Sequence, residues 1–340
     1  MASFPMQQLT NLSLSYDALV VGAGPAGAAT AMLLARAGAS VLLIDRNLPG
    51  VGARHAELLG PESAALLAEW GIVEAIARST PALHRTTTKR ANRLGEIVGS
   101  STIEHAPLYA PLRSLVDPLL VDAAIAAGVQ TRFVTSLIGL LRDSSGRVTG
   151  ARLDIGEEWT TTVRARFVIG ADGRSSATAR LVGADILTHG GLGISRLCGL
   201  IPCTLDEIRH HQVEGMSLDV LPTNDGLTSI SASTPFVPDA NNGAASRSSR
   251  LRSAVATLAP DLFLMIASRR FAGAVVEHAA RPRHQRRASG PGWALVGDAR
   301  ASSSGIAHGI ASALQDAVRL ADSIRNDIEW SAVAYAGVEA

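Results

Sequence analysis

Continuous apolar runs at both ends of the chain predict buried strands of a parallel sheet. The runs are residues 17–21, 41–44, 167–169 and 293–296. Between the first two, residues 28–37 are rich in Ala and Leu and predict a helix that ends at Gly38. Strand, glycine-rich turn, helix and strand within about 30 residues predict a βαβ unit.

Apolar residues at helical spacing predict the other helices. These helices span residues 61–76, 115–127, 253–264 and 311–324. Three strand-like runs joined by short polar turns (131–141, 147–155 and 160–166) predict an antiparallel meander that continues into the strand at 167–169.

The region between residues 181 and 290 has a different pattern. Runs at 216–221 and 227–233 flank Pro222-Thr223-Asn224-Asp225-Gly226, which predicts a hairpin. Residues 241–249 are rich in Asn, Gly, Ser and Ala and predict a loop. Residues 81–112 are less periodic and are expected to add strands to a second layer.

These elements predict an α/β protein whose nucleotide-binding domain is discontinuous, with a β-rich substrate domain inserted into it. The expected nucleotide-binding segments are 14–80, 112–184 and 286–326. The expected substrate domain comprises 81–111 and 185–285, and residues 1–13 and 327–340 are tails. Two ordinary sequential domains remain the alternative.

Composition narrows the class of protein. Apolar residues make up 47% and charged residues 18%, as in water-soluble globular proteins. Lys and Arg total 31 against 30 Asp and Glu, which argues against nucleic acid as a partner. The apolar stretch 18–44 is interrupted by glycines, Pro25 and Arg36, so no transmembrane segment is predicted.

The cysteines and the chain start favour a cytoplasmic location. Cys198 and Cys203 match no metal-ligand spacing, so no metal site is predicted. The first fifteen residues carry no Lys or Arg, unlike a secretory leader.

Gly22-Ala23-Gly24-Pro25-Ala26-Gly27 fits the G-x-G-x-x-G pattern after a strand and before a helix. Gly22 permits the tight turn, Gly24 lets a pyrophosphate approach the backbone, and Gly27 lets helix and strand pack closely. The helix N-terminus, including Pro25 and Ala26, then faces the pyrophosphate.

An acidic residue follows the second strand of this unit. Asp45 is placed to accept hydrogen bonds from a ribose, and its charge disfavours a 2′-phosphate in this pocket. Arg46 is expected to lie against the adenine.

Two further motifs resemble those of a known protein family. Residues 168–176 (VIGADGRSS), with Arg180 after them, and residues 293–299 (WALVGDA) resemble the Asp-Gly and Gly-Asp motifs of FAD-dependent monooxygenases of the aromatic-hydroxylase type. The phrases at 222–226 and 290–299 are most similar to the geranylgeranyl-reductase-like branch. The resemblance implies a glutathione-reductase-type fold and FAD as cofactor.

The resemblance also implies roles for individual residues. Asp298, after Gly297, would bind the ribityl chain, and Arg113 would lie near the FAD phosphate and ribityl region. Asp172 would lie near the pyrophosphate and the reduced nicotinamide cofactor. Leu137 falls on the strand whose backbone meets the adenine.

The segment 300–310 departs from the family pattern. Gly309 and Ile310 fit a helix start that faces the flavin, but Ser304 replaces a proline and Ala307 replaces a glycine. His308 is a candidate acid or base near the flavin, with an ordinary polar loop residue as the alternative.

By this resemblance, NADH or NADPH reduces the flavin and O2 adds at its C4a position. The resulting hydroperoxide would hydroxylate or epoxidise a small organic substrate. Two alternatives remain: a reductase of isoprenoid double bonds, and an FAD-binding partner protein without turnover. Lys89, the sole lysine, also suggests a halogenase, but the Trp-rich signature and loop glutamate of those enzymes are missing.

Overall fold

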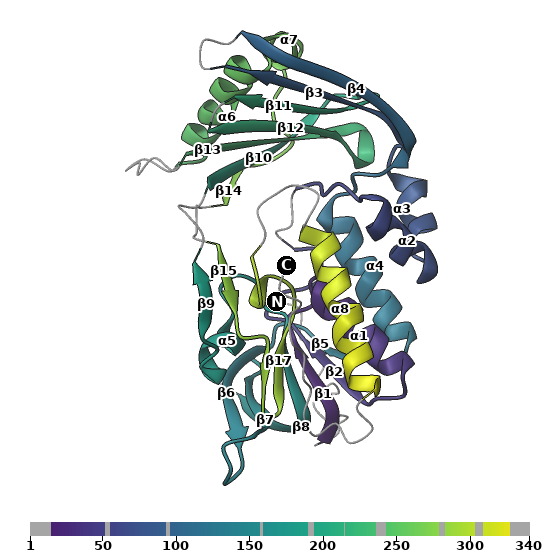
Figure 1. The fold of residues 1–340 in the computed structure, drawn as a ribbon, viewed down its shortest axis with the longest axis vertical. Coiled ribbons are helices and arrows are strands. Elements are labelled where there is room, and N and C mark those ends of the chain that lie inside the picture. The colour runs from purple at the N-terminus through teal and green to yellow at the C-terminus, as the bar shows by residue number, and fades with distance from the viewer. Residues whose placement is uncertain are drawn as a thin grey trace, which may run out of the picture.

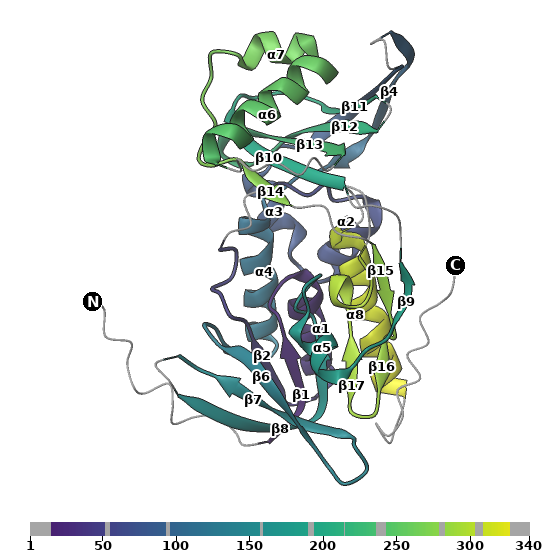
Figure 2. The same ribbon diagram turned by 90° about the vertical axis from the view of Figure 1, so that its left-hand side faces the viewer.

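The computed structural model describes residues 15–51, 55–92, 96–156, 159–189, 194–213, 215–235, 243–278, 283–302 and 309–326. Two large sheets lie at opposite ends of the molecule (Figures 1 and 2). One has eight strands and the other seven.

The eight-stranded sheet has a parallel centre in the order β17-β8-β1-β2-β5. Its central strands are β1 (Ser15–Val21), β2 (Val41–Ile44), β5 (Gln130–Arg132), β8 (Thr160–Gly170) and β17 (Trp293–Leu295). The antiparallel additions are β6 (Ser136–Arg142), β7 (Val148–Asp154) and β16 (Ser289–Gly290). The apolar runs of the sequence supply this parallel centre because both of its faces are covered.

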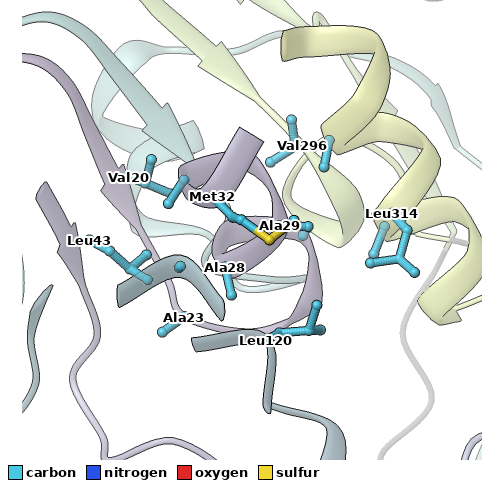
Figure 3. Packing of buried hydrophobic residues seen from close by; sticks show 14 of the residues in the cluster. Val20, Ala23, Ala28, Ala29, Met32, Leu43, Leu120, Val296 and Leu314 are labelled. Carbon is cyan, nitrogen blue, oxygen red and sulfur yellow. The ribbon is translucent and has the colours of Figure 1, made fainter. Parts of the chain in front are cut away.

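Three helices cover one face of this sheet: α1 (Pro25–Arg36), α4 (Arg113–Ala126) and α8 (Gly309–Asn326). Val20 and Leu43 point toward them and pack with Met32, Leu120 and Leu314 (Figure 3). Alternate residues of the same strands point to the other face, where β6, β7 and α5 (Ala177–Val182) lie. The parallel strands are therefore buried from both sides.

The seven-stranded sheet has the order β14-β10-β13-β12-β11-β3-β4. Its strands are β3 (Leu83–Ala91), β4 (Ile97–Leu108), β10 (Ile194–Pro202), β11 (Ile208–Val213), β12 (Met216–Pro222), β13 (Leu227–Pro235) and β14 (Val276–His278). Helices α6 (Ala244–Leu258) and α7 (Pro260–Ile266) cover its outer face (Figure 1). Strands from before and after α4 thus share one sheet.

Smaller elements connect these parts. The helices are α2 (Pro61–Glu69) and α3 (Val73–Ser79), and the short 3-10 turns are η2 (Asn224–Gly226) and η3 (Gly297–Ala299). Strands β9 (Ile186–His189) and β15 (His284–Arg286) pair with each other outside both large sheets.

The α/β class, the βαβ unit and the hairpin are confirmed, and several element boundaries were wrong. The helix predicted at 61–76 is two helices, because Gly71 adopts φ +78 between them. The run 131–141 forms β5 and β6, separated by Val134 at φ 54. The runs 160–166 and 167–169 form one strand, β8.

Two expectations near α6 were also wrong. The loop predicted at 241–249 becomes helical from Ala244. The helix predicted at 253–264 breaks at Ala259, and Pro260 starts α7 because proline fits the first turn of a helix but not its interior.

Candidate functional site

Loops that follow β1, β2, β8 and β17 meet at the carboxyl edge of the parallel sheet. The Gly22 amide donates to the Ile44 carbonyl at 2.8 Å, and the Ala171 amide donates to the Val21 carbonyl at 2.8 Å. The Val296 amide donates to the Gly170 carbonyl at 2.9 Å. Open parallel sheets bind ligands at this edge, so these loops form the candidate site.

The glycine turn has the shape that close backbone approach requires. Gly22 adopts φ +106, and a Cβ there would lie 2.4 Å from the Ala171 carbonyl oxygen. A Cβ on Gly27 would lie 1.7 Å from the Gly22 carbonyl oxygen. Pro25 starts α1, and no side chain caps the first turn of this helix. Its amides therefore keep their capacity to donate to an anion.

Arg113 lies over this turn as the first residue of α4. A Cβ on Gly24 would lie 3.6 Å from Arg113 Nη2. The guanidinium donates to both carboxylate oxygens of Asp117, at 2.7 and 2.9 Å. Burial lowers the pKa of Arg113, but Asp117, Glu57 and Asp298 outweigh this effect and raise it. The turn thus has a fixed positive charge beside its uncapped amides.

Asp45 already has a partner within the turn. Its Oδ2 accepts from the Ala23 amide at 2.7 Å, and its Oδ1 accepts from the Asn47 amide at 2.8 Å. Arg46 next to it is exposed, and Leu137 is buried in the core behind β2. The predicted contacts of Asp45 with ribose, and of Arg46 and Leu137 with adenine, stay predictions.

The Gly-Asp motif packs directly against the start of α1. Gly297 adopts φ +58, and a Cβ there would lie 2.8 Å from Cβ of Ala26. Asp298 pairs with Arg174 from the loop after β8, at 3.1 Å between Nε and Oδ2. Two of the predicted motifs therefore contact each other through backbone and small side chains.

Asp172 accepts from the first two amides of α5, whose N-cap residue is Ser176. Its Oδ2 accepts from the amides of Ala177 and Thr178, at 2.7 and 3.0 Å, and its Oδ1 accepts from the Ser176 hydroxyl. These bonds hold the Asp-Gly loop in place. A direct contact of Asp172 with cofactor stays a prediction.

At the start of α8, Ile310 is buried in the core. A Cβ on Gly309 would lie 3.4 Å from Oε1 of Glu57. His308, Ser304 and Ala307 lie outside the described residues, and so does most of the altered loop. The candidate role of His308 stays a prediction.

Sequence reasoning missed two acidic residues at this edge. Glu57 is 12% exposed and lies 3.5 Å from His55, between Arg113 and the start of α8. Asp316 is buried in α8, where it accepts from the Gly297 amide at 3.0 Å and pairs with Arg300. Asp316 could have been found from the sequence, because it is an acidic residue on the apolar face of the last predicted helix. No feature of the sequence singled out Glu57.

The position of Lys89 does not fit the catalytic lysine of a halogenase. Its Nζ lies 3.8 Å from Asp261 on α7, so it points to the helix-covered face of the seven-stranded sheet. Within the described ranges, no three His, Cys, Asp or Glu side chains are grouped to hold a metal ion. In the same ranges, no helix is long and apolar enough to cross a membrane.

The fold and this edge define a flavoprotein-type nucleotide-binding α/β protein. The family model described as "FAD binding domain" matches residues 15–332, and the chain belongs to that family. The resemblance seen in the motifs is thereby confirmed at the level of the family.

Curated relatives include reductases and hydroxylases. Digeranylgeranylglycerophospholipid reductase of Methanosphaerula palustris is 34% identical over 181 residues, covering 51% of this chain and 42% of that protein. Aklavinone 12-hydroxylase of Streptomyces peucetius is 32% identical over 203 residues, covering 54% of this chain and 40% of that protein. The chain thus spans less than half the length of these relatives.

Solved structures share the fold. The flavin-dependent brominase Bmp2 triple mutant superposes with a TM-score of 0.82 at 19% identity, covering 94% of this chain and 83% of that one. A complex of aklavinone-11 hydroxylase with FAD and aklavinone superposes with a TM-score of 0.72 at 20% identity, covering 93% and 63%.

Proposed function

We propose that this chain is an FAD-dependent monooxygenase that hydroxylates or epoxidises a small organic substrate with O2 and NADH or NADPH. The observation that carries the proposal is the meeting of the glycine turn, the Gly-Asp motif and Arg113 at one sheet edge. The names of relatives, among them 2,4-dichlorophenol 6-monooxygenase of Delftia acidovorans, add support.

The residues at this edge suit FAD. A diphosphate needs hydrogen-bond donors, positive charge and an unobstructed backbone, which the start of α1, Arg113 and Gly24 supply. Asp298 and Asp45 carry carboxylates that can accept from ribityl and ribose hydroxyls. When bound, FAD supplies the redox chemistry by which electrons from a nicotinamide cofactor activate oxygen.

The protein's own part is to bind, orient and exclude water. We assign FAD binding to residues 14–80, 112–184 and 286–326, and substrate binding to residues 81–111 and 185–285. The seven-stranded sheet then forms the wall that faces the site, because its other face is covered by α6 and α7.

A second candidate function is reduction of an isoprenoid double bond. The 34% identity with a digeranylgeranylglycerophospholipid reductase favours it. The two functions differ in their use of oxygen, since a reductase consumes reductant without taking up O2 in step with it.

The test records the visible spectrum of the purified protein. NADPH or NADH is then added under air, and an oxygen electrode measures oxygen uptake. Bound flavin that is bleached, with oxygen uptake in step with nicotinamide oxidation, is expected. Bleaching without oxygen uptake would favour the reductase. Flavin that neither nicotinamide reduces, with candidate phenols added, would indicate an FAD-binding protein without turnover. A protein that takes up no added FAD would contradict the proposal.

A further inference from the structure

The inner face of the seven-stranded sheet is identified by its alternating residues. Leu218 and Val220 of β12 pack among the residues of α6 and α7. Leu221, which points the opposite way, packs with Ala56 and Leu112 of the first part of the chain. The face that carries Leu221 is therefore the one that meets the FAD-binding part.

Strand register arranges this inner face in rows across the sheet. The row that contacts the FAD-binding part is mostly apolar and contains Ile208, Leu221, Ser229 and Leu200. The next row, two residues further along each strand, is made of hydrogen-bonding side chains. It runs through His210, Asp219, Ser231 and Cys198. Polarity thus changes abruptly along one buried face.

His210 and Asp219 form a hydrogen-bonded pair within this polar row. Nδ1 of His210 lies 2.6 Å from Oδ1 of Asp219. An ionised carboxylate can only accept, so Nδ1 of His210 donates to Asp219, and in a neutral imidazole the lone pair then lies on Nε2. The Asp219 side chain is 5% exposed, whereas that of His210 is 30% exposed. The carboxylate is thus buried behind an imidazole that is itself partly exposed.

The second carboxylate oxygen of Asp219 lacks a hydrogen-bond donor. Oδ2 is buried and has no hydrogen-bond partner among the described residues. The neighbouring hydroxyl of Ser231 is directed to Cys198 Sγ at 3.2 Å instead. A buried carboxylate oxygen without a donor is costly, and a catalytic role is one of the explanations for such a group in a native structure.

The inner face also adjoins the segment next to the candidate FAD site. Burial raises the pKa of the Cys198 thiol, and both Glu57 and Asp219 raise it further. On the same face, the ring of His278 on β14 lies 5.2 Å from the ring of His55, two residues before Glu57. The inner face therefore contacts the segment that carries Glu57, which adjoins the start of α8.

We propose that His210, oriented by Asp219, is the base that accepts the proton of an acidic hydroxyl, phenolic or enolic, on the substrate. This inference rests on the proposed function and narrows its substrate class. The substrate O–H bond breaks, its proton moves to Nε2, and the electron pair stays on the oxygen. Asp219 stabilises the imidazolium and is a positioning residue. The oxyanion makes the substrate carbon skeleton electron-rich, as oxygen transfer requires.

The test uses the FAD-loaded protein with 4-nitrophenol as probe and 4-nitroanisole, which lacks the hydroxyl, as its control. Difference spectra against pH report the ionisation of the bound phenol. The variants are His210→Gln and Asp219→Asn. His105→Gln is the matched control, because His105 lies on the inner face of β4 but bonds to Thr86.

Other titratable and charged groups that face this side must be separated from His210. On the sheet these are Arg90 of β3, Arg196 of β10 and His278 of β14, and on the facing segment His55 and Glu57. All of them remain in every variant, so a change seen only on substitution of His210 or Asp219 belongs to the pair.

In the wild type we expect the ionisation midpoint of bound 4-nitrophenol to fall by about 1–3 pH units, the effect of one adjacent cation. His210→Gln should abolish that shift, Asp219→Asn should reduce it, and His105→Gln should retain it. The result for Asp219→Asn is interpreted only if the circular dichroism spectrum of this variant matches that of the wild type. If it does not, the test relies on His210→Gln, which changes a partly exposed residue.

An unshifted midpoint in the wild type, or one that His210→Gln leaves in place, would overturn the inference. Failure of 4-nitrophenol to bind, or equal binding of 4-nitroanisole, would do so as well. None of these results alters flavin binding or reduction, which are read from the flavin spectrum. Loss of the proposed function would appear there instead.

Discussion

Changing each glycine of the turn to alanine should distinguish residues that the fold requires from a residue that FAD binding requires. A Cβ on Gly24 meets only Arg113 Nη2, at 3.6 Å, and Gly24 has an ordinary φ of −72. A Cβ on Gly22 or Gly27 would instead collide with backbone, at 2.4 and 1.7 Å. Gly24→Ala should therefore leave the protein folded and obstruct only the ligand.

The magnitudes follow from these contacts. Gly24→Ala should change the free energy of unfolding by no more than about 1 kcal/mol, since it replaces one N-cap residue. Losing hydrogen bonds to a charged phosphate costs about 1.5–3 kcal/mol. FAD should then bind roughly 10- to 150-fold more weakly. Gly22→Ala combines backbone strain and overpacking, and should destabilise the fold by about 2–6 kcal/mol.

The assay measures the two quantities separately. FAD affinity comes from fluorescence titration of the apoprotein, and stability comes from urea unfolding without FAD, because bound ligand would itself stabilise the fold. Gly38→Ala is the matched control at the other end of α1. With φ +90 and open space around it, this variant should lose about 1–2 kcal/mol of stability and keep its FAD affinity.

Two results would refute this reasoning. If Gly24→Ala bound FAD as tightly as the wild type, the turn would not be where the diphosphate lies. If it unfolded as readily as Gly22→Ala, the open space at Gly24 would not exist in solution.

Three further predictions concern charged groups. Arg113→Ala should cost about 3–5 kcal/mol by leaving Asp117 buried without its cation; replacing both by leucine should restore stability in urea but not FAD affinity, and recovery of both would contradict a role for Arg113. Asp172→Ala should reduce the free energy of unfolding by about 1–2 kcal/mol because the first amides of α5 lose their acceptor, and it should also weaken FAD binding; an unchanged affinity in the titration would contradict the predicted contact of Asp172 with cofactor. Desolvation of the ring and then His55 lower the pKa of His278 to about 4, although the residue keeps an exposed surface, so the ring should stay neutral at pH 5.5 by NMR. Its pKa is below the ordinary 6.5, so its contribution to stability is present above about pH 6.5 and is lost as pH falls through about 4; a ring that titrates near 6.5 would disprove it.

Local features of the sequence were enough to predict the nucleotide-binding half. A strand, a glycine turn and a helix are decided by neighbours within about one turn or one strand, so 17–21, 28–37 and 41–44 matched β1, α1 and β2 closely. The family motifs extended this to FAD, because each is a short segment with its own backbone requirement. Boundaries failed where one residue, such as Gly71 or Pro260, interrupts an otherwise periodic run.

The tertiary structure alone decided which distant side chains meet. Asp45 binds the Ala23 amide, and Glu57 lies beside Gly309, through contacts that no local pattern encodes. His210 and Asp219 face each other because β11 pairs with β12 in one register, and a shift of one strand by one residue would move its member of the pair to the opposite face. Alternation of apolar and polar residues along a strand shows that its two faces have different surroundings. Only the strand order of the sheet and the positions of the helices determine what each face contacts.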